Sequence, residues 1–464
     1  MTVSASDLSR GYVADLLGEW AAGLELNHIP IDALHEAKRC ILDVVGVSIA
    51  GASHPTAALI RDRLDVQYGT GSITILGTER STSIGGAAFA NGVAAHVWDY
   101  DDVSLEGMVH ATAAVFPAVL AIGQANNLNG ADLLTAFVAG VEAEYALGRA
   151  CTPDLFFRGW WTTGLLGAIG AAIGAGRAMG LGPPEMAQAV RIAASQTTGP
   201  YVLVGTPIKP YACGRAAEAG VNAASFAAAG LTGPDDAFEN RHGFTAMFAA
   251  DTFHPEEIAK LGERYVLNTS RLTFKQYPVC AGAQGSVAAV LKLTSENKLD
   301  AGEIEHLRCE VPPAIGHYMQ HRVPENITEA QFSLPYCVAC AMRFGDIGFE
   351  HLDEEAIRDA ITLAHLDKVE VVLSEDLAAQ EAANDDYIEP AIAIALTTDG
   401  RELRAMVKAP PGTPVQPLTD QQLEAKFEAC LATVPVSDTA AGLIDRIWHF
   451  EEQPSVLALL NTKR

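Results

Sequence analysis

The chain has 464 residues, a length that favours two domains over a single core. Apolar residues make up 49% and charged residues 19%, which is typical of a folded globular protein and excludes a disordered one. The net charge of −26 leaves little room for a large basic face, so it argues against nucleic acid as a partner.

The N-terminus and the apolar segments give no sign of export or membrane insertion. Residues 1–20 mix acids with an amphipathic pattern, unlike the basic and then apolar order of a signal peptide. The apolar run at 109–124 contains His, Pro and Gly and is too short to span a bilayer. The eight cysteines show no dense spacing, which argues against a disulfide framework. We therefore expect a cytoplasmic protein without a membrane partner.

Apolar residues at three- and four-residue spacing predict a succession of helices through the first 250 residues. The expected helices are 13–22, 31–49, 85–95, 111–125, 130–150, 164–180 and 184–195. Several are rich in Gly and Ala, as in 164–176. Glycine costs a helix about 1 kcal/mol per residue, so such helices are expected to be buried where backbones approach closely.

The pattern changes after about residue 265. Strands are expected at 304–311, 368–373, 391–397 and 402–407, with helices at 282–295 and 354–363. Asp399-Gly400 predicts a hairpin turn. A Pro-rich linker at 410–414 precedes helices at 420–431 and 439–450. The predicted fold is mainly α: a large all-helical domain (1–265), an inserted smaller α+β lid domain (266–408), and C-terminal helices (409–464) that return to the helical domain.

The segment 91–110 carries the strongest chemical signal. Asp99, Asp101 and Asp102 place three carboxylates within four residues, and His96 and His110 flank them. Such close like charges need nearby cations, a metal or helix N-termini to offset their repulsion. A bland alternative is a polar helix end with Asp102 or Ser104 as its N-cap. A divalent cation is another alternative, although the spacing matches no zinc or EF-hand pattern.

The order N-G-x-x-x-H-x-x-D-Y-D-D, followed by a histidine, resembles the hallmark of the MmgE/PrpD family. This family includes 2-methylcitrate dehydratase, cis-aconitate decarboxylase and iminodisuccinate epimerase. Three further segments resemble family motifs in the same order: Lys209-Pro210, residues 274–280 around Lys275, and F-S-x-x-Y ending at Tyr336.

The resemblance implies a homodimer with an active site between a helical domain and a smaller lid, and catalysis without a metal or another cofactor. It also implies a catalytic set of Asp99, His110, Lys209, Lys275 and Tyr336. A histidine near neutral pKa can move a proton, and lysines can hold carboxylates and stabilise enolate-like charge. Asp99 is expected either to orient His110 or to be the base itself. Tyr336 is expected to bond a carboxylate or protonate a leaving group.

The sequence also departs from the family pattern. Trp161 stands where many relatives have a histidine, and Gln284 stands near the place of another. Neither side chain titrates at neutral pH. With the neighbouring Trp160, Trp161 predicts an aromatic wall for a larger or less polar substrate. The expected substrate-binding residues are Arg158, Trp161, Gln284 and His96, with Arg241 and His242 as possible replacement contacts.

These patterns predict a cofactor-independent lyase, a dehydratase or decarboxylase, that moves a proton beside a carboxylate of a small di- or tricarboxylate. The alternatives are an epimerase or isomerase of a dicarboxylate, a non-catalytic carboxylate-binding protein and a metal-dependent hydrolase. Two minor alternatives are Cys280 as a covalent nucleophile and the Cys337-x-x-Cys340 pair as a metal or redox site.

Overall fold

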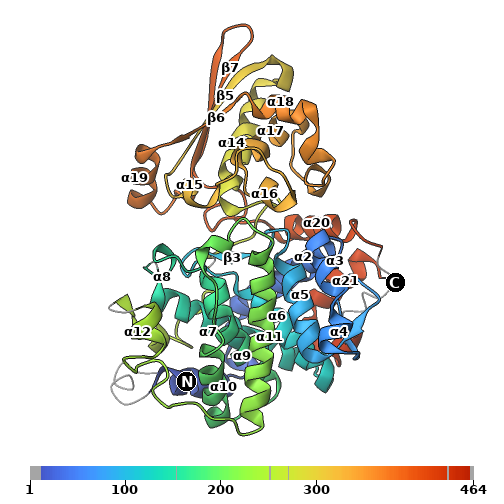
Figure 1. The fold of residues 1–464 in the computed structure, drawn as a ribbon, viewed down its shortest axis with the longest axis vertical. Coiled ribbons are helices and arrows are strands. Elements are labelled where there is room, and N and C mark those ends of the chain that lie inside the picture. Colours follow the sequence, from blue (N-terminus) through green and yellow to red (C-terminus); the bar gives the residue numbers. More distant parts are fainter. Residues whose placement is uncertain (1–11, 153, 250–251, 270, 436–437, 460–464) are drawn as a thin grey trace.

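The computed structural model describes residues 12–459, apart from 153, 250–251, 270 and 436–437. Helices dominate, so the prediction of a mainly α chain is confirmed. Figure 1 shows a large helical body in its lower half and a smaller α+β part above it. The expected helices form, apart from 354–363, and their ends either match the prediction or shift by at most two residues.

The helical body is built around α9 (Thr162–Ala178), which packs against α6 (Ala111–Asn126), α7 (Gly130–Cys151) and α11 (Ile208–Ala228). The small residues make this close packing possible. A Cβ atom on Gly220 of α11 would lie 2.5 Å from the backbone carbon of Ala171 in α9, so only glycine fits there.

The remaining elements of the body surround these helices. They are α1 (Val13–Ala22), α2 (Ile31–Gly51), α3 (Pro55–Arg61), α4 (Leu64–Tyr68), β1 (Ile73–Thr74), β2 (Ser81–Thr82), α5 (Ile84–His96), α8 (Asp154–Phe157), α10 (Pro183–Ala194), α12 (Phe244–Phe248) and α13 (Pro255–Ala259). Single 3-10 turns occur at Leu26–His28 and Tyr201–Leu203.

The α+β part contains a sheet of strand order β6 (Val369–Leu373), β5 (Ile304–Val311), β7 (Ala391–Thr397) and β8 (Glu402–Val407). β5 and β6 are parallel and the other pairs are antiparallel. The apolar residues of β5 are buried and the polar residues between them are exposed or partly exposed. The helices α14 (Ala281–Asn297) and α17 (Leu334–Phe344) pack against the sheet. The other helices here are α15 (Ile315–Tyr318), α16 (Ile327–Gln331), α18 (Ala360–Leu366) and α19 (Glu375–Ala383), with 3-10 turns at Ala301–Glu303, Phe349–His351 and Ala356–Arg358.

The helix predicted at 354–363 is wrong in its first half. Only one 3-10 turn, Ala356–Arg358, forms there, and α18 starts at Ala360. The cause is Asp359, whose side chain accepts the backbone N–H of Thr362 and caps α18 at its N-terminus. A residue with the extended backbone of an N-cap ends the preceding turn.

The end of the chain packs on its beginning. α20 (Asp420–Leu431) lies along α2, and α21 (Ala440–Trp448) and α22 (Val456–Leu459) follow. Phe427 of α20 sits against Gly46 of α2, where a Cβ atom would lie 2.9 Å from its ring. Two short strands, β3 (Val103–Ser104) and β4 (Leu272–Thr273), pair with each other. This pairing brings the segment after Asp102 beside the segment that leads to Lys275.

Within the described residues, no single helix is long and apolar enough to cross a bilayer. The bent pair of segments Ile31–Gly51 and Pro55–Tyr68, at 81°, meets that test by length and composition only.

Candidate active site

A cavity of about 100 Å³ lies where residues of the helical body meet residues of the α+β part. The helical body contributes the polar side chains of Asp99, His110, Tyr201 and Lys209 to the wall of this cavity, and the segment after β4 contributes Lys275, Tyr318 and Glu389. Apolar side chains complete the wall: Val103, Leu105, Met108, Phe156, Trp161, Val204 and Phe332. The volume suits a small molecule. Four residues that the family motifs predicted for the site, Asp99, His110, Lys209 and Lys275, lie together in this wall.

Among the residues that the structure describes, four helices begin at the wall of this cavity. His110 is the N-cap of α6, Trp161 is the N-cap of α9, Lys209 is the second residue of α11, and Cys280 is the N-cap of α14. Unpaired backbone N–H groups and the positive end of the helix dipole favour anions at each start. The cavity is therefore suited to a negatively charged ligand, in spite of the net charge of the chain.

Asp99 is held by two lysines. The Lys209 ammonium pairs with Asp99 Oδ1, and Lys275 Nζ lies 3.4 Å from Asp99 Oδ2 and donates to the Asp99 backbone oxygen at 2.6 Å. Burial alone would raise the pKa of Asp99, but Lys209 and Lys275 outweigh it and hold this pKa far below its ordinary value. A carboxylate so strongly stabilised is a poor proton acceptor, and its contacts hold the two ammonium groups in place.

The pairing also keeps Lys275 charged. Burial would lower the pKa of its ammonium, but Asp99 and Asp101 raise it above the ordinary value. Lys209 stands at the start of α11, where the helix dipole disfavours a cation, and Asp99 offsets that cost. Two ammonium groups that share one carboxylate keep N–H donors for an anionic ligand.

His110 is oriented by Asp101 rather than by Asp99. His110 Nδ1 lies 3.0 Å from Asp101 Oδ2 and 3.1 Å from the Asp102 carbonyl oxygen, two acceptors that require a proton on Nδ1. The other nitrogen, Nε2, is then unprotonated and free to accept a proton. Burial lowers the pKa of His110 to about 4, so the ring is neutral at physiological pH. Asp101 and His110 therefore have the arrangement of a general base, with Nε2 as its free acceptor, and an orienting carboxylate.

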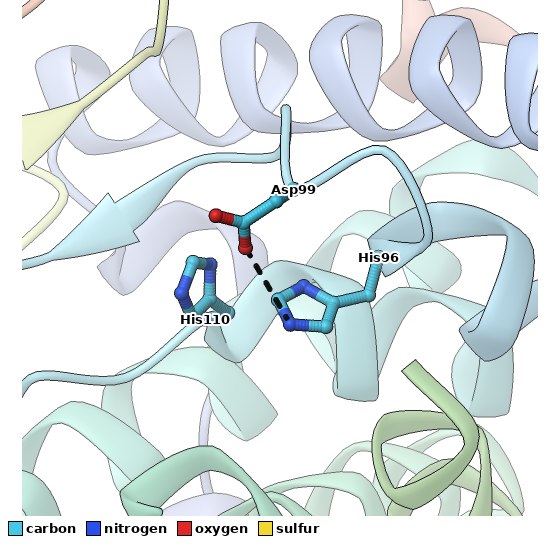
Figure 2. Close-up of side chains that lie close together, drawn as sticks. All are labelled: His96, Asp99 and His110. Atoms are coloured by element: carbon cyan, nitrogen blue, oxygen red, sulfur yellow. Dashed lines mark ion pairs between the residues drawn. The ribbon is translucent and has the colours of Figure 1, made fainter. Parts of the chain in front are cut away.

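The same Asp101 holds a second histidine. His96 Nδ1 lies 2.9 Å from Asp101 Oδ2, and its Nε2 lies 3.9 Å from Asp99 Oδ1. Figure 2 shows the side chains of His96, Asp99 and His110 gathered beneath one turn of chain. His96 is fully buried behind the cavity wall, and it stacks on Trp161 with ring centroids 5.4 Å apart. Its position supports the wall, whereas direct contact with a ligand was predicted.

Asp102 is a buried acid of a different kind. Burial, Asp43 and Asp101 raise its pKa well above the ordinary value, and Thr112 donates a hydrogen bond of 2.9 Å to its Oδ2. A protonated carboxyl group explains how three acids can stand within four residues. Neither Asp102 nor Ser104 caps a helix, so the N-cap alternative is wrong; His110 occupies that place.

Trp161 is part of the wall, as predicted. The Lys209 ammonium lies 5.8 Å from the centroid of its ring and 5.2 Å from that of Phe332. Trp160 is not part of it, because its ring packs edge-on against Phe248 at 5.0 Å. The aromatic wall consists of Trp161 with Phe156, Tyr201, Tyr318 and Phe332.

Several predicted site residues lie elsewhere. Gln284 is buried and bonds the backbone of 276–279 through both ends of its amide, so it shapes the loop after Lys275. Tyr336 is fully buried in the α+β part, where its hydroxyl donates to the His351 carbonyl oxygen at 2.6 Å. Arg158 is exposed and outside the cavity wall. Arg241 and His242 are exposed as well. These positions do not support ligand contact by the five residues.

Sequence reasoning missed Tyr318 and Glu389, which line the cavity from the α+β part. It also missed Lys426 of α20, whose ammonium donates to the backbone oxygens of Tyr100 and Lys275 at 2.8 and 2.9 Å. Glu389 also has a left-handed backbone, with a φ of 45°, which is uncommon for a residue other than glycine and which the sequence does not indicate. No local pattern marks these residues, since each reaches the site through the tertiary fold.

The cysteines fit a structural role. All eight are buried free thiols, and Cys337 and Cys340 lie together inside α17. Cys280 touches the cavity, but burial and the nearby Asp99 raise the pKa of its thiol to about 12. A thiol that is protonated at neutral pH is a weak nucleophile, which argues against covalent catalysis by Cys280.

His96, Asp99 and His110 could in principle hold a metal ion, because one ligand atom from each lies within 4.8 Å of the others. Two ammonium groups already neutralise Asp99, however, and a divalent cation would have to displace them. We therefore expect dialysis against EDTA to leave turnover unchanged, as measured by product formation before and after treatment. Loss of activity that one divalent ion restores would contradict this assignment.

Replacing Trp161 tests the aromatic wall. We expect Trp161→Ala to raise KM about tenfold, equivalent to about 1.4 kcal/mol, because the indole shapes the cavity beside the Lys209 ammonium. Trp160→Leu is the matched control, since that ring faces Phe248. Steady-state kinetics would compare the two. An unchanged KM in Trp161→Ala, or in Trp161→His, would remove this residue from the ligand contacts.

Two protein-family models match most of the chain. The MmgE/PrpD N-terminal domain matches residues 15–256, and the MmgE/PrpD C-terminal domain matches residues 277–449. The chain is 27% identical to the cis-aconitate decarboxylase of Mus musculus over 454 residues, 94% of this chain and 91% of the relative. It is 24% identical to a cis-aconitate decarboxylase-like protein of Aspergillus oryzae over 485 residues, 99% and 98% of the two chains. It is 26% identical to the cis-aconitate decarboxylase of Aspergillus terreus over 358 residues, 72% and 73%.

Proposed function

The chain belongs to the MmgE/PrpD family, as its motifs predict, and we propose that it is a cofactor-independent carboxy-lyase for a small unsaturated di- or tricarboxylate. The observation that carries this proposal is the neutral His110. It is oriented by Asp101, and it faces a cavity that two lysines and several helix N-termini make attractive to anions. The decarboxylases among its relatives favour loss of carbon dioxide over loss of water.

The proposed reaction begins with the carboxylates of the substrate. Lys209 and Lys275 bind them with the N–H donors that Asp99 leaves free. His110 Nε2 then takes a proton from the carbon beside one carboxylate, and the electron pair spreads onto that carboxylate. The lysines stabilise the resulting charge without having to reorganise, because Asp99 holds them in place. Return of a proton to another carbon moves the double bond, so that a second carboxylate can leave as carbon dioxide.

The cavity wall indicates the class of substrate. The aromatic wall that includes Trp161 suits a ligand with an apolar or planar section beside its carboxylates. An unsaturated acid such as cis-aconitate meets that description and is the first compound to test.

The test is a product and exchange assay. EDTA-treated protein would be incubated in heavy water with cis-aconitate, methylcitrate, citramalate, iminodisuccinate and aromatic dicarboxylates, and followed by proton NMR. Release of carbon dioxide with deuterium in the product is the expected result. Exchange with inversion of a stereocentre would indicate an epimerase instead. Tight binding without exchange would indicate a carboxylate-binding protein.

Three expectations from the sequence stay predictions. One is that residues 266–408 form a lid that closes over the substrate. The others are the homodimer and the cytoplasmic location. A lid would explain why Tyr318 and Glu389 reach the cavity from the α+β part, since closure would complete the site around a bound ligand.

A further inference from the structure

The proposed reaction needs a proton donor as well as a base, and His110 does not supply one in its resting state. Its single proton is on Nδ1, facing Asp101 and the Asp102 carbonyl oxygen, and Nε2 is bare. The ammonium groups of Lys209 and Lys275 are both engaged by Asp99, which also raises the pKa of Lys275. Cys280 has a thiol whose pKa burial raises to about 12, so it gives up a proton poorly. The donor must come from another part of the wall.

Glu389 and Tyr318 stand on the α+β side of the cavity, across from the helical body that carries His110. The Tyr318 hydroxyl lies 3.0 Å from Glu389 Oε1. Burial raises the pKa of Glu389 to about 7 and that of Tyr318 well above its ordinary value. The carboxyl group is therefore partly protonated at neutral pH, when His110 is neutral, and environments that separate two titratable groups in this way assign an acid and a base.

The chain is built to hold this pair. Two glycines in the first turns of α14 make room for it. A Cβ atom on Gly282 would lie 2.4 Å from the Tyr318 ring, and one on Gly285 would lie 2.4 Å from the Glu389 backbone oxygen.

The backbone at Glu389 also has a strained conformation. Its φ is 45°, in the left-handed region, and its N–H donates to Glu381 Oε1 of α19 at 2.6 Å. A left-handed backbone is strained for a residue other than glycine, and such strain is typical of functional sites.

We propose that Glu389, hydrogen-bonded to Tyr318, is the proton donor of this site. The inference rests on the proposed function and adds its missing acid. When His110 takes the proton beside one carboxylate, the carbon at the far end of the double bond takes a proton from the Glu389 carboxyl group. Carbon dioxide then leaves, the carbon it leaves takes the proton back from His110, and the Glu389 carboxylate regains one from water. The sum is loss of carbon dioxide and uptake of one proton.

The donor must be protonated, which fixes the sign of the pH dependence. The groups that face Glu389 are Tyr318, Glu381, Lys275 and Asp99. Desolvation is the largest influence, and Glu381 and Asp99 also raise its pKa, whereas Tyr318 and Lys275 lower it. Turnover should therefore fall as the pH rises through about 7, because the carboxyl group loses its proton.

The decisive variant is Glu389→Gln, which keeps the shape and a hydrogen bond to Tyr318 but cannot donate a proton in this way. With cis-aconitate as substrate, we expect kcat to fall about 100-fold and the decline above pH 7 to disappear. Glu389→Asp should recover part of the activity, since it restores the acid. Asp386→Asn, on the exposed turn nearby, is the control and should match the wild type.

The inference would be overturned by Glu389→Gln with wild-type kcat and an unchanged pH profile. A variant that loses activity but keeps the wild-type decline above pH 7 would also overturn it, because a merely structural role predicts that pattern. A measurement without substrate separates this inference from the proposed function. Infrared difference spectra of the wild type and Glu389→Gln at pH 6 should show the carbonyl stretch of one protonated acid, and its absence would remove Glu389 as donor even if no carboxylate is turned over.

Discussion

Replacing His110 with glutamine should lower turnover by about 10²–10⁴-fold, the usual contribution of a positioned acid–base group. Glutamine can still hydrogen-bond to Asp101, so the packing around the start of α6 should survive. What disappears is the free Nε2 acceptor at the cavity wall. Steady-state kinetics and exchange of the substrate proton in heavy water would measure the loss, and both rates should fall together because they share the abstraction step.

His54 offers a matched control. It is also buried, and burial likewise lowers its pKa to about 4, but its ring packs edge-on against Trp98 and caps α3. His54→Gln should therefore keep nearly full turnover. If His110→Gln retained activity within tenfold of the wild type, another group would have to be the base.

The pH dependence should report the same residue. Burial lowers the pKa of His110 to about 4, and a base must be unprotonated to act. On the acid side, kcat/KM is therefore expected to fall as the pH drops through about 4, where the ring gains its second proton, whereas the decline above pH 7 belongs to Glu389. Asp101→Asn should weaken this base, because an amide cannot stabilise the imidazolium that forms. The measurement is the pH profile of kcat/KM for the wild type and for Asp101→Asn, in which the variant should have the lower kcat/KM.

The sequence was sufficient to bring four of the site residues together. Asp99, His110, Lys209 and Lys275 are 176 residues apart at their extremes, yet the order of motifs predicted their shared site, and the cavity wall contains all of them. The helices and strands were predictable for a simpler reason. Their apolar spacing of 3.6 or 2 residues reflects which face is buried, and that periodicity is local.

The different contacts of Asp99, Asp101 and Asp102 could not be predicted from their spacing in the sequence. Asp99 has a φ of 48°, in the left-handed region, and this one backbone rotation turns its side chain toward the lysines. Asp101 then points toward both histidines. The sequence shows three equivalent carboxylates, and only the fold makes one an anchor for lysines, one an orienting group for histidine and one a buried acid.

The tyrosine illustrates a second limit. The motif ending at Tyr336 predicted a catalytic hydroxyl, but that residue is inside α17 with its hydroxyl satisfied by the His351 carbonyl oxygen. Tyr318, in the short helix α15, reaches the cavity instead. A motif residue can be needed for packing as much as for chemistry, and the two demands are not distinguishable in one sequence.

Lys426→Met is expected to have the largest effect on stability, about 3–5 kcal/mol of unfolding free energy, because it leaves a buried charge without its partner. Lys426 Nζ lies 2.7 Å from Asp43 Oδ1 of α2 and 3.8 Å from the centroid of the Tyr100 ring. It also donates to the backbone oxygens of Tyr100 and Lys275, next to Asp99 and within the segment that carries a site lysine. Urea unfolding would measure the loss, and turnover should fall as well because the backbone beside both residues loses its anchor.

The double variant Asp43→Asn/Lys426→Met separates the two consequences. It removes the unpaired carboxylate, so much of the stability should return, while the backbone oxygens of Tyr100 and Lys275 still lack their donor and turnover should stay low.

The pH dependence of the unfolding free energy provides a separate test of the single variant Lys426→Met. Burial raises the pKa of Asp43 and Lys426 opposes this, so removing the lysine raises that pKa further. A carboxyl group whose folded-state pKa exceeds its unfolded value destabilises the fold as the pH rises, so the deficit should be largest at neutral pH and shrink toward pH 4. A deficit independent of pH would mean that Lys426 acts through packing alone. Wild-type turnover in a destabilised Lys426→Met would mean that the C-terminal helix supports the fold and not the position of Lys275.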